Sequence, residues 1–562
     1  MFRRKFYDTL FMDACQVGNK WICFAIALLP CLCQAACEIS IAVNQVGYLP
    51  EAPKWCRCEK PPAKDYAIFT IGTDVVWRCV RRGDWKPVRP GAQAVEADFS
   101  DLRQPGDYLI LSGTNVAETV PCWIPSDCAE ARSFYFVIRT NVYDTVERSF
   151  LNYYTWQRCG SKKGWAGLCH QDRCPLVGTD RTIDVRGGYH QSCDLRNWGD
   201  GISMSVYALL RYAETARPLW DEGQIRDEVR WGCDYFLKLV GPEGYAYDAQ
   251  FTPIGWGPRR YYVVPAAFGA QANIAMLLAR AAVYFKDDKD YAARLVGTAR
   301  RVFEQMETNP FFDCARPSPE PNLPAGAQPA ERFYPQNYRT SATGLAGRSM
   351  AALELYRATG EKPFADLALK YGRALVALQI PDGENAGAYR LHASTNALGF
   401  ADCGYTRTIH GERTPLELFR TFGGDVWRTA ALRTADRIKA KLVRQAMLPG
   451  DPKSGGSAQA AGSWSLYLNE CAELFGQDDL RPYAQRTLDW VYGANPMLMS
   501  YIEGVGHNQR QRPVFGQFFP STPQIPGAVI HTATGEYDMP AVAMVLWATH
   551  RLRGWNLSWA DE

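Results

Sequence analysis

The pattern of hydrophobic and polar positions changes once along the chain, near Val142. From about Ile39 to Ile138, short runs of alternating hydrophobic and polar residues, such as YAIFTI and SFYFVI, are separated by turn-rich segments such as RRGDWKPVRPG. Alternation with a period of two is typical of strands that bury one face. We therefore expect a small antiparallel β-sandwich over residues 37–139.

After Val142 the hydrophobic residues recur at three- and four-residue spacing, which predicts helices. Small residues are frequent in these segments, so neighbouring helices can approach closely. A long succession of helices without βαβ alternation indicates a closed toroid or solenoid of helix pairs over residues 140–562. The predicted helices are 202–215, 226–240, 269–285, 291–306, 341–358, 364–379, 424–447, 454–475, 480–493 and 539–552.

The first 36 residues differ from both regions. Four basic residues precede an apolar run, WICFAIALLPCLCQAA, that is too short to span a bilayer comfortably. This order predicts a signal peptide over residues 1–36 and a secreted or periplasmic protein, with a short membrane anchor as the alternative. Cys37 follows two alanines in a weak lipobox-like context, which allows a lipid anchor at Cys37.

Composition and charge limit the classes of partner. The 562 residues are 47% hydrophobic, enough for a large buried core, and the net charge is only +3. Because no long basic run is present, a nucleic-acid partner has no support. Aromatic residues make up 13% of the chain and could stack on sugars, although most aromatic side chains are core. The composition permits a carbohydrate-binding protein, which we expect to be a monomer without a membrane span.

Cysteine is abundant, with 18 residues, of which Cys15, Cys23, Cys31 and Cys33 lie in the first 36. The others are free to pair in an oxidising compartment, or to remain as buried thiols. Candidates for pairing are Cys122 with Cys128, and Cys56, Cys58 and Cys79 among themselves, whereas Cys233, Cys403 and Cys471 are interpreted as isolated thiols.

Four segments in the first 190 residues resemble family 9 of the glycoside hydrolases, the cellulase family. They are IAVNQVGYLPEAPK (41–54), DFSDLRQPGDYLI (98–110), NVYDTVERSFLNYYTWQRCG (141–160) and DVRGGYH (184–190). The resemblance implies an all-α (α/α)6-barrel catalytic domain preceded by a small all-β immunoglobulin-like sandwich. It also implies hydrolysis of a β-linked glucan or a related oligosaccharide.

The resemblance continues to the C-terminus. YGANPMLMSYIEGVGHNQ (492–509) is similar to the loop that closes the substrate cleft in the family, and GEYDMPAVAMVLWA (535–548) is similar to the final barrel helix with its acidic start. FGQFFPSTPQIPG (515–527) is similar to a less typical branch of the family. The chain is thus identified as a divergent member.

The resemblance assigns the two carboxyl groups that an inverting glycosidase needs, one to protonate the leaving oxygen and one to activate water. The family's base loop has the form G-G-W-[HY]-D-A-G-D, and the chain has GGYHQSCD. Asp194 keeps the place of the base, whereas Gln191 replaces the first aspartate. Glu536 matches the acid, with Asp538 as the alternative. Gln191 can hold water but cannot take a proton, so we expect reduced or altered hydrolysis.

Two functions therefore remain open. The first is a secreted inverting hydrolase with base Asp194 and acid Glu536, and the second is a non-catalytic carbohydrate-binding homologue that lost hydrolysis through Gln191. Aromatic and charged residues in loops are candidates for sugar contacts, partly by position in the family pattern. They are Trp198, Trp256, Tyr262, His410, His507 and Arg512.

Cys159, Cys169, His170 and His190 supply two thiolates and two imidazoles, the donor set of a tetrahedral structural zinc site. The set is similar to the zinc site of some family 9 members. A Cys159–Cys169 disulfide with two ordinary histidines is the alternative, but the chain has only 7 histidines, so two in this arrangement favour zinc. Bound zinc would hold His190 four residues before Asp194. Calcium is common in the family, but no loop here identifies its ligands.

Overall fold

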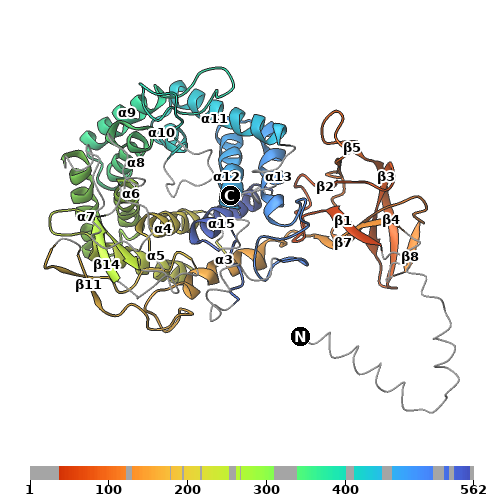
Figure 1. Cartoon of the computed structure of the whole chain (residues 1–562), viewed down its shortest axis with the longest axis horizontal. Helices are drawn as coiled ribbons and strands as arrows, with labels where there is room; N and C mark the ends of the chain where they lie inside the picture. The colour runs from red at the N-terminus through yellow and green to blue at the C-terminus, as the bar shows by residue number, and fades with distance from the viewer. Residues whose placement is uncertain are drawn as a thin grey trace, which may run out of the picture.

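The computed structural model places two units side by side, strands in one and helices in a ring in the other (Figure 1). The residues that it describes are 37–121, 129–176, 179–192, 195, 197–215, 218–251, 261–265, 268–308, 338–399, 411–445, 458–509, 524–530 and 537–556. The predicted signal peptide, residues 1–36, lies outside this part of the chain. Among the described helices, none combines the length and the apolar character that crossing a bilayer requires.

The N-terminal unit is built from ten short strands that hydrogen-bond in one series. The strands are β1 (Glu38–Ala42), β2 (Trp55–Cys58), β3 (Asp65–Ile71), β4 (Val76–Asp84), β5 (Lys86–Pro87), β6 (Val95–Asp98), β7 (Gly106–Ser112), β8 (Thr119–Pro121), β9 (Ala131–Ser133) and β10 (Phe136–Ile138). Their order is β5-β6-β2-β1-β9-β7-β3-β4-β8, with β10 on β7. The pairs are antiparallel except β1 with β9.

Alternation along these strands divides the core into two hydrophobic clusters, because successive side chains of a strand point to opposite faces. On β7, Ile110 joins one cluster, whereas Leu109 and Leu111 join the other. This packing confirms the predicted all-β character of the N-terminal unit. Cys37 also packs against the second cluster, and its half-buried position gives no support to a lipid anchor.

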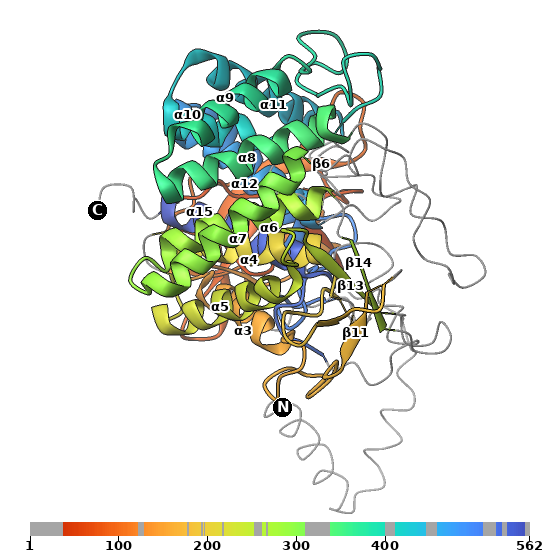
Figure 2. The same cartoon turned by 90° about the vertical axis from the view of Figure 1, so that its left-hand side faces the viewer.

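The second unit is a ring of helix pairs. The inner helices are α4 (Gly199–Ala213), α6 (Phe268–Tyr284), α8 (Ala342–Thr359), α10 (Thr414–Phe422), α12 (Ala458–Phe475) and α15 (Met539–Asn556). Their outer partners, in the same order, are α5 (Glu222–Leu239), α7 (Lys289–Thr308), α9 (Lys362–Val376), α11 (Asp425–Arg444), α13 (Arg481–Val491) and α3 (Asp144–Trp156). Figure 2 shows α6 to α9 from the side, packed as neighbouring rods.

Burial distinguishes the two layers of the ring. The outer helix α9 buries Phe364, Ala368, Tyr371 and Leu375, at three- and four-residue spacing, and leaves its other face to solvent. The inner helix α12 is instead buried on nearly every side. The surroundings of α12 are therefore protein rather than water, and its small residues Ala458, Ala461 and Gly462 allow close approach of its neighbours.

The ring closes because its first and last helices pack together. α15 lies against α3 as well as against α4 and α12. In the α3–α15 contact, His550 Nδ1 lies 3.0 Å from Glu147 Oε2, and both side chains are fully buried. These contacts join residues about 400 positions apart in the sequence. The twelve described helices and the ring confirm the predicted all-α barrel.

Two helices and two hairpins were not predicted. α3 carries many aromatic and β-branched residues, which are weak helix formers, and α10 is only nine residues long. The hairpins are β11 (Arg173–Pro175) with β12 (Thr182–Asp184), and β13 (Tyr247–Phe251) with β14 (Tyr261–Pro265). Cys56, Cys58 and Cys79 are free thiols, so they do not pair among themselves. Cys122, Cys128 and Cys403 lie outside the described residues.

The sandwich and the ring meet at α13 through a buried carboxylate. Asp489 accepts hydrogen bonds from Asn44 Nδ2 at 2.8 Å, Trp55 Nε1 at 2.9 Å and Gln485 Nε2 at 2.7 Å. Burial raises the pKa of Asp489 to about 7, against the lowering effect of these donors. Arg486 adds an ion pair with Glu96 at 2.9 Å. The two units are therefore joined by specific polar contacts inside an apolar surround.

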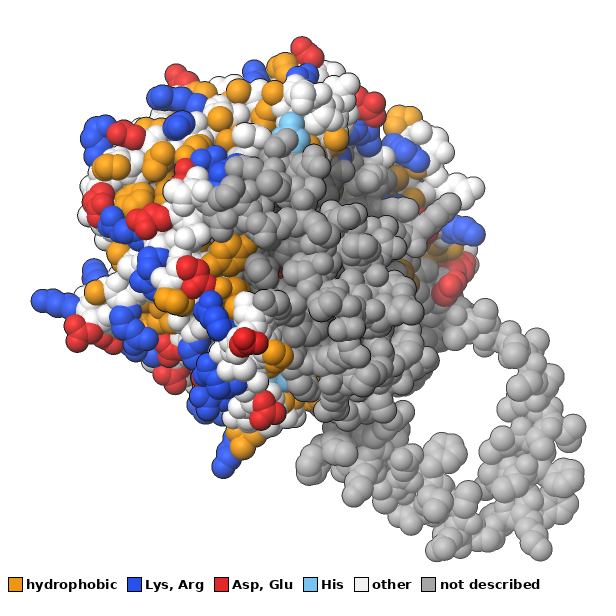
Figure 3. Space-filling view, turned by 60° about the vertical axis from the view of Figure 1, so that its left-hand side comes forward, with side chains coloured by type: hydrophobic (Ala, Val, Ile, Leu, Met, Phe, Trp, Pro, Cys, Tyr) orange, Lys and Arg blue, Asp and Glu red, His pale blue; other side chains and the backbone are white. Residues whose placement is uncertain are grey.

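Charged side chains are mixed on the surface. On the face shown in Figure 3, Lys and Arg are interspersed with Asp and Glu over the described helices. The whole chain has 62 Lys and Arg against 59 Asp and Glu.

Candidate functional site

The loop before α4 is anchored to α5, and to the residues that follow α3, by a buried polar group. Tyr189 OH donates to Glu228 Oε2 at 2.8 Å, and Arg158 Nε donates to the same oxygen at 2.8 Å. Gly188 has φ +68°, and a Cβ there would lie 2.7 Å from the ring of Tyr235. Only glycine fits this position without displacing the ring. The GGYH segment is therefore held by its glycine and by Glu228.

The next residue, Gln191, joins this loop to the start of α15. Gln191 Nε2 donates to Asp538 Oδ1 at 3.1 Å, and Met539 N donates to Gln191 O at 2.8 Å. Both side chains are buried, with 6% of Gln191 and 5% of Asp538 exposed. A Cβ on Gly201 would lie 2.4 Å from Gln191 Oε1, so this glycine makes room for the amide on α4.

The amide of Gln191 has a defined orientation. Nε2 faces Asp538 Oδ1, and Oε1 faces Gly201 of α4. Oε1 is buried and has no hydrogen-bond partner among the described residues. The Gln191 amide thus presents an acceptor oxygen beside α4.

The predicted base Asp194 and acid Glu536 lie outside the described residues. Asp194 follows Gln191 by three positions, and Glu536 precedes Asp538 by two. Ser192, two residues before Asp194, forms an antiparallel bridge with Asp538, two residues after Glu536. The roles of Asp194, Glu536 and Gln191 stay predictions, as does the alternative acid Asp538.

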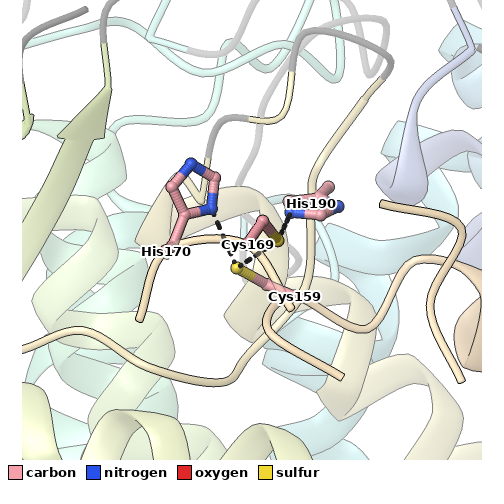
Figure 4. A group of neighbouring side chains, drawn as sticks. All are labelled: Cys159, Cys169, His170 and His190. Atoms are coloured by element: carbon pink, nitrogen blue, oxygen red, sulfur yellow. Dashed lines mark hydrogen bonds between the residues drawn. The ribbon is translucent and has the colours of Figure 1, made fainter. Parts of the chain in front are cut away.

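A cysteine and histidine cluster adjoins this loop (Figure 4). Cys159 follows α3, Cys169 and His170 lie on the following turns, and His190 precedes Gln191. Their ligand atoms all lie within 4.8 Å of one another, and the four side chains could hold a metal ion. Cys159 Sγ lies 3.7 Å from Cys169 Sγ, too far for the disulfide considered as the alternative.

The cluster atoms form a closed set of short contacts. Cys159 Sγ lies 3.1 Å from His170 Nδ1, and Cys169 Sγ lies 3.2 Å from His190 Nε2. Gly160 N donates to Cys169 Sγ at 3.2 Å. Burial raises the pKa of Cys159, whereas the hydrogen bond from Cys159 lowers the pKa of Cys169. The two thiols thus have opposite shifts, and the contact between their sulfurs couples them.

Comparison with known sequences decides the family. The sequence profile of glycosyl hydrolase family 9 matches residues 143–517, and that of the cellulase N-terminal ig-like domain matches residues 37–116. The chain belongs to glycosyl hydrolase family 9. Its enzyme class is therefore that of the glycoside hydrolases, and its N-terminal unit is an immunoglobulin-like domain.

Individual relatives are distant. Endoglucanase 23 of Oryza sativa subsp. japonica is 26% identical over 63% of this chain and 70% of its own length. A cellodextrinase of Butyrivibrio fibrisolvens is 21% identical over 84% of this chain and 86% of its own. The crystal structure of the Zn-binding triple mutant of endoglucanase J30 has a TM-score of 0.68 at 18% identity, over 90% of this chain and 99% of that one. These values describe a divergent family 9 member.

The structure places two of the predicted sugar-binding residues of this family 9 chain. Trp198 is half-buried and lies directly before the first residue of α4. The His507 ring stacks on Phe134 of the sandwich, with centroids 5.8 Å apart, and burial lowers the pKa of His507. Their roles as sugar ligands stay predictions. Trp256, His410, Arg512 and the side chain of Tyr262 lie outside the described part of the chain.

The sequence did not identify several residues that support the loop. Glu228 lies on α5 and anchors Tyr189, and Asp248 Oδ1 accepts a hydrogen bond from Gly199 N at 2.7 Å and so caps α4. Both acidic residues are far from the loop in sequence, with no motif around them. The GGYH segment itself was identified only through its resemblance to the family's loop.

Proposed function

We propose that the protein is a secreted, inverting glycoside hydrolase that cleaves a β-linked glucan or a related oligosaccharide. Asp194 acts as the base that activates water, and Glu536 acts as the acid that protonates the leaving oxygen. The endoglucanase and cellodextrinase relatives support this substrate class. Export is supported by the apolar run that follows the basic N-terminal residues.

The observation that carries the proposal is the contact between Gln191 and Asp538. It joins the loop that carries Asp194 to the start of the helix that follows Glu536, through one side-chain hydrogen bond and one main-chain hydrogen bond. An inverting mechanism requires its acid and base on opposite sides of one glycosidic bond. A direct link between the two loops supports a shared site for both groups.

Gln191 supports a working but altered base loop. Its amide holds the loop to Asp538 and keeps hydrogen-bonding capacity, so Asp194 can still act as the base. An amide lacks the negative charge that would hold the water more firmly and raise the basicity of its neighbour. We therefore expect a lower turnover than that of an otherwise identical chain with aspartate at position 191.

The test is release of reducing sugar from β-glucans, xylan, chito-oligosaccharides and aryl glycosides. The native chain is compared with Asp194→Ala, Gln191→Asp and, as a matched control, Asp366→Ala on the exposed face of α9. Loss of the general base should lower kcat by about 10²–10⁴-fold, with the control unchanged. NMR of the first product should show the anomer opposite to that of the substrate.

The same experiment distinguishes a working hydrolase from the alternative, a non-catalytic carbohydrate-binding homologue. A native chain that binds sugar without cutting it, together with a Gln191→Asp variant that gains turnover, would establish the non-catalytic homologue. Equal activity in the native chain and Asp194→Ala would remove Asp194 from the role of base.

The cysteine and histidine cluster is best explained as a structural zinc site held by Cys159, Cys169, His170 and His190. Two thiolates bound to one tetrahedral zinc ion, at about 2.3 Å each, lie about 3.8 Å apart, close to the observed 3.7 Å between Cys159 and Cys169. Zinc would supply a positive charge that holds both thiolates and both imidazoles in place. A family 9 structure that binds zinc also supports this assignment.

A further inference from the structure

One side chain of the sandwich is inserted into a loop of the barrel unit. Gln45, with only 5% of its surface exposed, reaches the segment 492–509, here called the anchor loop. Gln45 Nε2 donates to Leu498 O at 2.8 Å, and Gln45 Oε1 accepts from His507 N and Asn508 N, each at 2.9 Å. Every polar atom of the amide is thus used by main-chain groups of the anchor loop.

The anchor loop is shaped around this amide by two glycines. A Cβ at Gly493 would lie 2.5 Å from Gln45 Nε2, and a Cβ at Gly506 would lie 3.0 Å from Gln45 Oε1. Both glycines have positive φ, +112° and +90°. The main chain of Gln45 also donates to Tyr492 O at 2.9 Å. The anchor loop therefore forms a socket that holds Gln45 by four hydrogen bonds.

The anchor loop is paired in turn with the segment 525–530. Ile530 N donates to Tyr501 O at 2.8 Å, and Gly527 N donates to Glu503 O at 2.8 Å. Glu503 N donates back to Ala528 O at 2.9 Å, and its carboxylate accepts from Ile525 N at 2.9 Å. The position of the anchor loop thus fixes the register of the segment 525–530.

The segment 525–530 continues the same set of bridges to the candidate active site. Asp538 N donates to Val529 O at 3.2 Å, Ile530 bridges Tyr537, and Met539 N donates to Gln191 O at 2.8 Å. Four main-chain segments therefore lie in consecutive hydrogen-bonded contact. The first holds the Gln45 amide, and the last carries Gln191.

We propose that Gln45 is a positioning residue for the hydrolase site, supplied by the N-terminal sandwich. By fixing the anchor loop it sets, through the segment 525–530, where the start of α15 meets the base loop at Gln191. This inference rests on the proposed function, because it concerns the geometry of the loops that carry Asp194 and Glu536. The sandwich then has a defined task at the site in addition to its contact with α13.

The first test measures hydrogen exchange in the full chain, which needs no catalytic activity. Gln45→Ala is compared with Glu96→Gln, which removes the interface ion pair to Arg486 without touching the anchor loop. We expect Gln45→Ala to raise amide exchange of Ser500, Ile530 and Met539 at least about tenfold, because local opening exposes amides that the bridges protect. Glu96→Gln should leave these amides at native rates. Equal exchange in the two variants would overturn the proposal.

The second test uses Gln45→Glu, which keeps the shape of the side chain. The ionised carboxylate cannot donate to Leu498 O and repels it, whereas the protonated acid restores a donor. Relative to the native chain at each pH, kcat of this variant should be about tenfold lower at pH 7, with a small change in KM, and should recover towards pH 4. Gln45→Ala should not recover, which excludes a general effect of pH.

The outcomes separate this proposal from the proposed function. A native chain without hydrolysis, whose Ile530 and Met539 amides still depend on Gln45, would contradict the function and keep the structural link. A catalytically active chain in which Gln45→Glu and Gln45→Ala both keep native kcat at pH 7 would contradict the positioning role.

Discussion

The two ends of the inner helix ring are stabilised in different ways. At the end near Gln191, here called the site end, loops are held by main-chain bridges, by one amide and by the cysteine and histidine cluster. At the other end, here called the far end, buried arginines and glutamates fill the ring. Gln191 packs on Gly201, and Arg211 lies ten residues further along α4, about 15 Å away at 1.5 Å per residue.

The far end is organised around Glu417 of α10. Arg211 and Arg357 each approach its carboxylate at 3.1 Å, and Arg420 approaches at 2.7 Å. Burial alone would raise the pKa of Glu417, but these guanidinium groups and that of Arg413 overcome burial and hold its pKa well below its usual value. Buried charges of this kind are tolerated only when they are fully paired.

The comparison shows how one ring separates stability from chemistry. The far end uses charges that must stay ionised and fixed, on helices packed from all sides. Among its described residues the site end has one such buried ion pair, Arg158 with Glu228, and otherwise relies on loops joined by main-chain bridges. Loops of this kind can carry groups that exchange protons with a substrate. Substitutions at the far end should therefore change folding alone, and those at the site end should change folding and turnover together.

The largest effect on stability is expected from Glu417→Gln. It leaves four arginines around a neutral group, and breaking a buried ion pair by removing one partner costs about 3–5 kcal/mol. Urea unfolding should show this loss, while kcat of the folded protein stays within about twofold of native. A parallel fall in kcat would contradict the separation of the two ends.

Removal of zinc should have a slightly smaller effect on folding and should also reach the active site. At free zinc about 1,000 times Kd, the bound ion contributes about 4 kcal/mol. Elemental analysis should find one zinc per native chain and none in Cys159→Ser, with a lower Tm and lower kcat in the variant. The matched control is Cys233→Ala, a buried free thiol of α5, which should keep its zinc. Native zinc content in Cys159→Ser would exclude the cluster as the site.

A pH-dependent effect of about 2 kcal/mol is expected from Asp489 between pH 5 and pH 6.5. Its pKa is raised to about 7 in the folded chain, so over this range the folded state keeps a proton that the unfolded state has lost. Stability from this group is therefore present at low pH and decreases as pH rises. Urea unfolding at several pH values should show this decrease in the native chain and not in Asp489→Asn.

Asp489 and Glu417 should respond to pH in opposite directions, which sharpens the comparison. The lowered pKa of Glu417 gives stability that is present above its usual value of 4.5 and is lost as pH falls towards the folded pKa. Greater loss of stability at pH 4 than at pH 7 in Glu417→Gln would contradict this assignment.

The smallest effect is expected from the exposed pair Lys362 and Asp366 on α9. Their side chains are 82% and 58% exposed, and an exposed pair contributes about 0–1 kcal/mol. Asp366→Asn should change the free energy of unfolding by less than about 1 kcal/mol and should not change kcat. A loss as large as that of Glu417→Gln would show that burial does not explain the difference between the two pairs.

Local sequence was sufficient for most of the architecture. Ten helices were predicted with ends within a few residues of those described, because a period of 3.6 in apolar residues is a property of consecutive positions. Short hydrophobic runs likewise indicated the strands of the sandwich, although burial of both faces at Leu109, Ile110 and Leu111 was not predicted. α3 and α10 were missed because packing, rather than propensity, stabilises them.

The candidate site was predicted only in part. The GGYH glycines, the replacement at Gln191 and the four cluster residues were identified from the residues themselves and from the resemblance they carry. The partners Glu228, Asp248 and Gln45 were not, because each acts on a segment far away in sequence. The different burial of Cys159 and Cys169, which raises the pKa of Cys159, is likewise contained in no local pattern.

The sequence by itself determined the strand and helix texture, the family and the donor set of the metal cluster, since each depends on residue types at fixed spacing. Only the tertiary structure decided that Gln191 contacts Asp538, that the two cysteine sulfurs are 3.7 Å apart, and that Gln45 fills a socket in the anchor loop. Those contacts join positions up to about 450 residues apart. Their energy is realised only when closure of the ring and docking of the sandwich remove water from both partners.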